Sequence, residues 1–108
     1  MIATTPPPAR VQVVAQEFRF SLSRLRVRAG YVVIELVNAG QDAHDLELQR
    51  VGGSRIVSWP TLQPGQHLDR ELRLQPGRYS LWCSLPGHRA LGMQAVLVVS
   101  RTTPKRPG

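Results

Sequence analysis

The sequence lacks a second cysteine. Cys83 is the only cysteine among 108 residues, so the chain cannot form an internal disulfide, a four-cysteine zinc site or an iron–sulfur cluster. Any metal site built by this chain contains at most one cysteine thiolate. A chain of this length still folds without cross-links, because it buries about two thirds of the surface that its unfolded form exposes.

Long apolar runs are also missing. No stretch of the sequence approaches the roughly 20 apolar residues that cross a bilayer. The first residues do not show the basic region and apolar core of a signal peptide. Either the protein is cytoplasmic, or a leader lies outside this sequence.

Lysine is scarce, whereas arginine is abundant. Lys105 is the one lysine among 14 basic residues, and seven acidic residues leave a net charge of +7. This balance predicts an acidic partner, which could be nucleic acid, an anionic membrane surface or an acidic protein. Nucleic acid is disfavoured because the few aromatic residues lie mainly in expected strands and offer no stacking platform for bases.

The chain is expected to contain one domain with two tails. Proline-containing tails are predicted at residues 1–10 and 101–108, and the domain at residues 11–100. The hydrophobic fraction of 42% against 19% charged residues is typical of a folded globular domain.

Between the tails, β-branched runs with partial apolar and polar alternation predict strands, and Gly, Pro and Asn clusters predict turns. No helix-length stretch remains between these breaks. Seven or eight short strands favour an all-β fold, an antiparallel Greek-key sandwich. We expect strands over residues 11–18, 25–27, 31–38, 44–49, 56–59, 66–74, 78–83 and 94–100.

The residues with the richest chemistry lie near the C-terminus. Four residues separate Cys83 from His88, and four separate His88 from Met93. Each of these residues alone is more often structural, but a thiolate, an imidazole and a thioether at this spacing can converge on one metal ion. Two histidines, one cysteine and a weak axial methionine are the ligands of blue-copper electron-transfer centres.

The second histidine has two candidates. His44 follows a turn and opens an expected strand, whereas His67 lies inside a strand between Gln66 and Leu68. We expect His44 to be the ligand, because a donor from a separate strand lets the sandwich fix the geometry. His67 is the minor alternative.

With these residues, the sequence resembles the cupredoxins, the small blue-copper proteins, over residues 17–99. The spacing in the C-terminal loop is most similar to that of auracyanin and rusticyanin. The resemblance implies a cupredoxin-like sandwich with one type 1 copper ion, His44, Cys83 and His88 as equatorial ligands and Met93 as the long axial ligand. Asp45 departs from plastocyanin and azurin, which have Asn after the first ligand; Asp could accept hydrogen bonds from loop amides or Ser84, and its charge would favour Cu(II).

The predicted function is transfer of single electrons between larger redox proteins by Cu(II)/Cu(I) cycling. One alternative is a copper carrier or assembly domain that holds Cu(I) without redox turnover, and another is a sandwich that binds no metal. An enzyme is not expected, because oxidases and nitrite reductases of this fold need further histidines, and only His67 is left over.

The remaining expectations concern partners and location. We expect a monomer that meets a redox protein with an acidic docking surface and binds no nucleic acid. In cupredoxins an apolar patch around the second histidine seats the partner, here Leu85, Pro86, Ala90 and Leu91 around His88. The resemblance implies a periplasmic or other extracytoplasmic location, with a leader or membrane tether outside this sequence.

Overall fold

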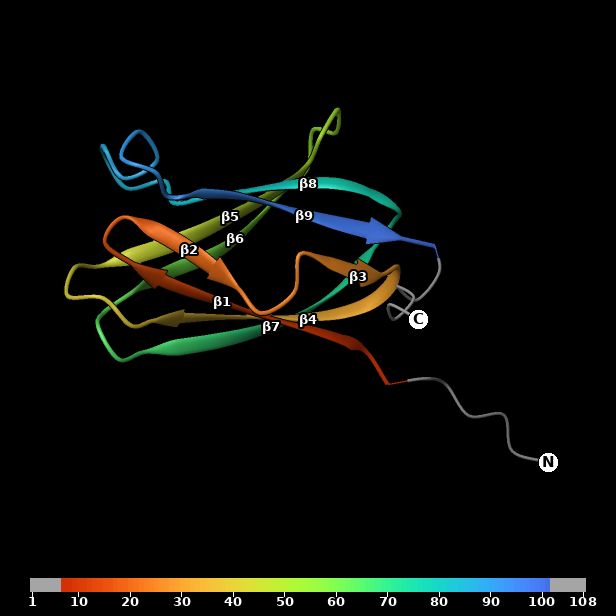
Figure 1. The fold of residues 1–108 in the computed structure, drawn as a ribbon, viewed down its shortest axis with the longest axis horizontal. Coiled ribbons are helices and arrows are strands. Elements are labelled where there is room, and N and C mark those ends of the chain that lie inside the picture. The colour runs from red at the N-terminus through yellow and green to blue at the C-terminus, as the bar shows by residue number, and fades with distance from the viewer. Residues whose placement is uncertain (1–6, 102–108) are drawn as a thin grey trace, which may run out of the picture.

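The computed structural model describes residues 7–101, which form nine β-strands and no helix (Figure 1). No membrane-spanning helix is therefore present among these residues. Residues 1–6 and 102–108, most of the two predicted tails, lie outside the described residues. The strands are β1 (Ala9–Gln16), β2 (Arg19–Leu22), β3 (Arg26–Arg28), β4 (Gly30–Asn38), β5 (His44–Arg50), β6 (Ile56–Leu62), β7 (His67–Leu74), β8 (Gly77–Trp82) and β9 (Gln94–Ser100).

The strands form two sheets that pack face to face (Figure 1). One sheet has the strand order β2-β1-β4-β7, and the other has the order β3-β9-β8-β5-β6. The predicted all-β sandwich is confirmed. There are nine strands rather than seven or eight, because the four residues of β2 are too few to show a period in the sequence. The β1–β4 and β3–β9 pairs are parallel, and the other pairs are antiparallel.

Alternation along β1 shows why these residues form a strand. Val11, Val13 and Ala15 are buried in the core, while Gln12 between them is exposed. Successive side chains of a strand point to opposite faces, so this pattern buries one face of the strand. Branched valines also favour the extended backbone.

Strand β7 is less buried than its sequence suggests. Leu68, Leu72 and Leu74 share one parity, which predicts a single buried face. In the structure Leu74 is buried, Leu72 is half-buried and Leu68 is 37% exposed. The reason is that β7 is the edge strand of its sheet, so the facing layer covers only part of it.

The core lies between the sheets and draws side chains from both. Its largest fully buried apolar members are Trp59, Ile34, Leu36, Leu46, Leu48, Leu81, Met93 and Leu97. Because several of these come from β5 and β8, the strands that lead to the chemistry-bearing residues are anchored in the core.

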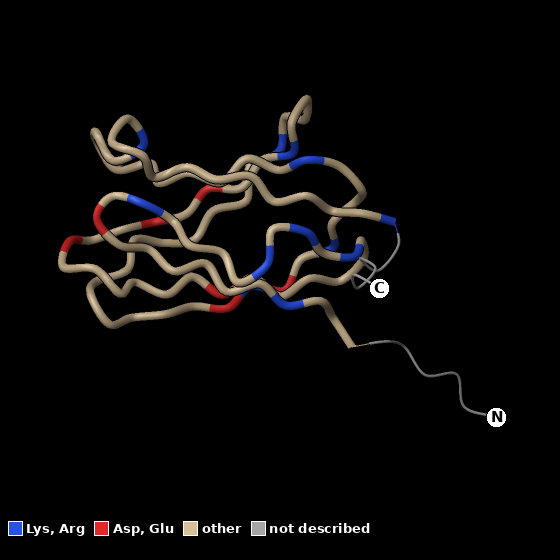
Figure 2. The backbone as a smooth tube through the Cα atoms, in the orientation of Figure 1, with Lys and Arg blue, Asp and Glu red and all other residues tan. Residues whose placement is uncertain are grey.

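Charge is distributed unevenly along the molecule. Figure 2 shows acidic residues gathered in the half that contains the β4–β5 loop, whereas most basic residues lie toward the opposite end. The net charge of +7 is therefore not spread evenly over the surface.

Replacing a core leucine tests the packing. Leu36→Ala should lower the free energy of unfolding by about 2–5 kcal/mol, because it leaves a cavity in the core. Leu36 is fully buried, whereas Leu25 is 68% exposed, so Leu25→Ala should change it by no more than about 0.5 kcal/mol. Urea unfolding of the two variants measures both, and equal losses would contradict the described core.

Candidate metal centre

Antiparallel pairing brings three chain segments to one end of the sandwich. Strand β5 begins at His44, and its antiparallel neighbour β8 ends at Trp82, just before Cys83. Strand β9, which is antiparallel to β8, begins directly after Met93. The start of β5, the end of β8 and the start of β9 therefore lie at the same edge of the sheet.

Three of the four predicted ligands meet at this edge. The donor atoms of His44, Cys83 and His88 all lie within 4.8 Å of one another. The His44 and His88 Nδ1 atoms are 3.2 Å apart, and the Cys83 Sγ atom is 3.6 Å from His88 Nδ1. His44 and Cys83 are fully buried, while His88 is half-buried.

The spacing of these donors fits one metal ion. Two nitrogens about 2.0 Å from an ion at tetrahedral angles lie about 3.3 Å apart, and such a nitrogen and a sulfur about 2.3 Å from the ion lie about 3.5 Å apart. The observed distances of 3.2 and 3.6 Å agree with these values to within about 0.1 Å. Among first-row metals, a thiolate together with imidazoles suits copper, so the cluster fits a single type 1 copper ion.

Met93, the fourth predicted ligand, is fully buried, and its backbone bonds to two residues of the cluster. Its backbone nitrogen donates to the His88 carbonyl at 3.1 Å, and its carbonyl accepts from the Cys83 nitrogen at 3.1 Å. These two bonds tie the start of β9 to both ends of the Cys83–His88 loop. The role of Met93 as axial ligand stays a prediction.

Asp45 links the first histidine to the cysteine loop. Its carboxylate accepts hydrogen bonds from the Ser84 backbone nitrogen, at 2.7 Å, and from the Ser84 hydroxyl. The Asp45 backbone nitrogen lies 3.5 Å from Cys83 Sγ, to which it donates. The expected acceptor role of Asp45 is thus confirmed, with Ser84 supplying both donors.

Glu17, in the turn between β1 and β2, approaches His44 from the other side. Its Oε1 atom accepts from the backbone nitrogens of Gln41 and Asp42 at 2.7 and 2.6 Å, and it lies 3.0 Å from His44 Nε2. The bond from the Asp42 backbone is the largest cause of a lowered Glu17 pKa, about 2 instead of the usual 4.5, and the bond with His44 adds to it. Glu17 is therefore ionised at neutral pH.

Asn38 holds the chain that leads into His44. This fully buried side chain donates through Nδ2 to the carbonyls of Asp42 and Leu62, at 2.8 and 3.0 Å. Its Oδ1 atom accepts from the Gly40 nitrogen at 2.9 Å. A buried amide with its bonds satisfied keeps the loop in one conformation.

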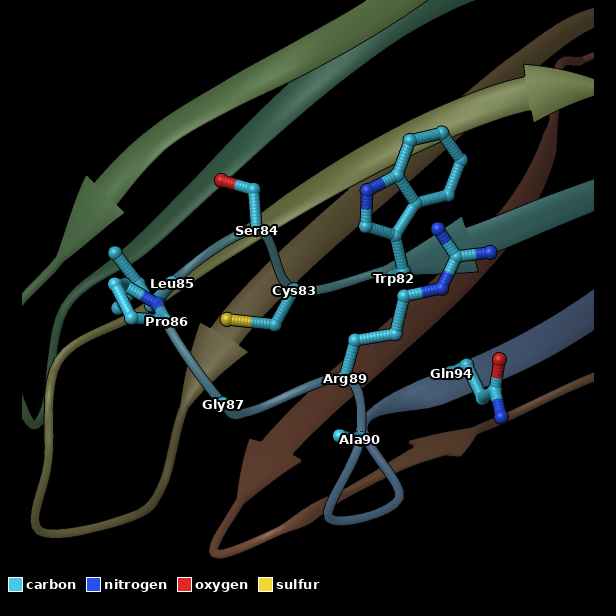
Figure 3. Close-up of a pocket in the computed structure, with 9 residues that line it drawn as sticks. All are labelled: Trp82, Cys83, Ser84, Leu85, Pro86, Gly87, Arg89, Ala90 and Gln94. Atoms are coloured by element: carbon cyan, nitrogen blue, oxygen red, sulfur yellow. The ribbon is translucent and has the colours of Figure 1, made fainter.

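The Cys83–Met93 loop covers the site from the outside. Figure 3 shows the Cys83 sulfur pointing into the curve formed by the loop from Ser84 to Gly87. Phe18 packs against the His88 ring in an edge-to-face contact, with ring centroids 5.0 Å apart. The Arg89 guanidinium lies 4.7 Å from the centre of the Trp82 ring, which fixes the outer part of the loop.

The structure places His67 away from this cluster. Its side chain is 67% exposed on β7, where it lies 3.2 Å from Glu35 and in one group with Asp69. His44, and not His67, therefore stands beside Cys83 and His88.

Sequence reasoning missed three contributors to the site: Glu17, Phe18 and Asn38. Glu17 and Phe18 are far from Cys83 in sequence, and no spacing rule connects them to it. Asn38 carries a weak signal, because it ends an apolar strand and precedes a glycine-containing turn.

No family model matches the chain, and no curated protein matches its sequence. Auracyanin A from Chloroflexus aurantiacus, a "blue" copper protein, is similar in structure, with a TM-score of 0.68 and 19% identity over 87% of this chain and 100% of auracyanin A. Rusticyanin from Thiobacillus ferrooxidans has a TM-score of 0.68 and 19% identity over 87% of this chain and 79% of rusticyanin.

A multicopper oxidase also shares the fold. It has a TM-score of 0.63 and 21% identity over 90% of this chain, but only 44% of the oxidase chain is matched. At these identities the comparisons establish the fold, which is that of the cupredoxins, as the sequence resemblance predicts.

Reactivity of the metal-free thiol tests the burial of Cys83. Burial raises the pKa of the Cys83 thiol, and only the thiolate is alkylated. Iodoacetamide at pH 8 should modify the folded metal-free protein at least about tenfold more slowly than the urea-unfolded chain. The rate at which the folded protein is modified should still rise above pH 9, where the modification rate of an ordinary thiol with a pKa of about 8.5 approaches its maximum. Mass spectrometry follows the reaction, and equal folded and unfolded rates would show that Cys83 is exposed.

Proposed function

We propose that this chain is a cupredoxin, a mononuclear type 1 copper protein that carries single electrons between larger redox proteins. The observation that carries the proposal is the meeting of the His44, Cys83 and His88 donor atoms within 4.8 Å at one end of the sandwich. The fold shared with auracyanin A, a blue copper protein, supports it.

Four side chains would hold the ion. His44, Cys83 and His88 would be the equatorial ligands, and Met93 the weak axial one. Copper, when bound, supplies the Cu(II)/Cu(I) couple. The chain's contribution is a fixed set of donors, because two of the equatorial side chains are fully buried and their backbone is tied by Asp45, Ser84 and Met93. Donors that stay in place leave less to rearrange when the charge of the ion changes.

His88 offers the route to a partner. It is the one half-buried member of the three-donor cluster, and its loop carries Leu91, which is 62% exposed, and the partly buried Leu85. This apolar surface would seat the partner against the edge of the His88 ring. Apolar contact of this kind is not weakened by salt, whereas guidance by charge is.

The partner would be a redox protein, with the acidic docking surface predicted from the net charge. Arg89, beside His88 in the chain, is placed to meet such a surface, whereas acidic residues gather in this half of the molecule and most other arginines lie toward the far end, so the net charge would guide the approach more than the docking patch itself (Figure 2). The proposed function has no enzymatic step, since the chain has one histidine, His67, beyond the two in the cluster. We place the protein outside the cytoplasm, where copper carriers of this fold typically work.

Titration of the metal-free protein with Cu(II) tests the function. An intense absorption band near about 600 nm and a narrow EPR hyperfine splitting are expected from a bond between Cu(II) and a cysteine thiolate. Cys83→Ser should abolish the band, and His44→Ala or His88→Ala should abolish or shift it.

The matched control is His67→Ala, which removes the one other histidine and should leave the band unchanged. An intense band in Cys83→Ser would overturn the assignment of the thiolate. Tight Cu(I) binding without the coloured Cu(II) form would instead identify a Cu(I) carrier, and no binding of either ion would identify a sandwich without a metal function.

Met93→Leu tests the axial ligand. Leucine has nearly the volume of methionine, so the fold should be kept. The protein should remain coloured, and its reduction potential should rise because a weak donor to Cu(II) is lost. Cyclic voltammetry of the copper-loaded variant and wild type measures the shift, and an unchanged potential would exclude Met93 from the site.

A further inference from the structure

His44 is a fully buried histidine whose two ring nitrogens face different partners. Its Nδ1 atom faces His88 Nδ1 at 3.2 Å, while its Nε2 atom lies 3.0 Å from Glu17 Oε1. Since the ring has no exposed surface, these two side chains decide which nitrogen carries the proton.

The chemistry of Glu17 settles that choice. Glu17 Oε1 accepts hydrogen bonds from the Gln41 and Asp42 backbone nitrogens, so it faces His44 as an acceptor, and the Nε2 atom is the donor. In a neutral imidazole the other nitrogen then has the free lone pair. The lone pair of His44 is therefore on Nδ1, the atom that faces His88 Nδ1 at 3.2 Å.

Glu17 is itself held in place. Its Oε1 atom accepts from the Gln41 and Asp42 backbone nitrogens at 2.7 and 2.6 Å. Gly40 leaves the space that the carboxylate occupies, because a Cβ atom there would overlap Glu17 Oε1. The orientation of the carboxylate toward His44 is thus set by the loop that leads into His44.

We propose that Glu17 is a positioning residue, which fixes His44 with its proton on Nε2 and its Nδ1 lone pair toward the metal and which supplies negative charge to that ligand. The statement about the metal rests on the proposed copper function, whereas the statement about the proton does not. Carboxylates that accept from the second nitrogen of a ligating histidine make it a stronger donor, and losing them costs about 10–100-fold in metal affinity.

The consequence differs between the two oxidation states. A negative charge behind His44 stabilises Cu(II) more than Cu(I), because Cu(II) has the larger charge. Removing it should therefore lower the affinity for Cu(II) about 10–100-fold and the affinity for Cu(I) less. The reduction potential should rise accordingly.

Glu17→Gln separates this role from that of a loop clamp. The amide oxygen can still accept from the Gln41 and Asp42 nitrogens, but the charge is gone. Glu71→Gln is the matched control, since it removes one negative charge from the exposed face of β7. The Glu17→Gln protein should show a raised reduction potential and weakened Cu(II) binding, whereas Glu71→Gln should show neither. A potential equal to that of wild type in Glu17→Gln would overturn the electrostatic role.

Nitrogen-15 NMR of the metal-free protein tests the proton directly. Wild type should show the His44 proton on Nε2, slow to exchange with solvent, and Glu17→Ala should show a mixture of tautomers or fast exchange. A circular dichroism melt confirms that each variant is folded. A wild-type His44 proton on Nδ1 would overturn the proposal. If wild type fails to form the blue centre while its proton is on Nε2, the copper function fails and the positioning of His44 by Glu17 stands.

Discussion

The antiparallel pairing of β5 with β8 is the constraint on which the site depends. The pairing sets Trp82, the last residue of β8, opposite Glu47 of β5, so the first residues of β5, with His44, and Cys83, which follows β8, lie at the same end of the sheet. Both strands contribute fully buried leucines to the core. A shift of one residue in the register would turn these leucines outward, so the energy that packs the core also fixes the donor spacing.

The strand pairing brings the donor residues near one another, and a set of polar contacts then fixes the positions of their side chains and loops. Asp45 ties the start of β5 to Ser84, Asn38 ties its preceding loop to Leu62, and Glu17 contacts that loop and the His44 ring. Each of these three side chains joins segments that are distant in sequence. Buried polar groups with their bonds satisfied favour one conformation over its alternatives, which is what a preformed site requires.

Much of this architecture could be predicted from sequence because it has local signals. Alternation and turn residues indicate most strands, and the spacing of Cys83, His88 and Met93 points to the loop between β8 and β9. The parallel pairs, the exposure of Leu68 and the contact of Glu17 with His44 have no such signal. They depend on which strands become neighbours in space, and no local pattern in the sequence determines that.

The close approach of Gly40 to Glu17 links the substitutions that these two positions can accept during evolution. The backbone of Gly40 does not adopt the left-handed region, so glycine is needed there for space. A descendant that gains a side chain at position 40 must move or shorten the one at position 17, and with it alter what touches His44. A substitution in the β4–β5 loop at Gly40 would therefore also change the contact that Glu17, in the β1–β2 turn, makes with His44.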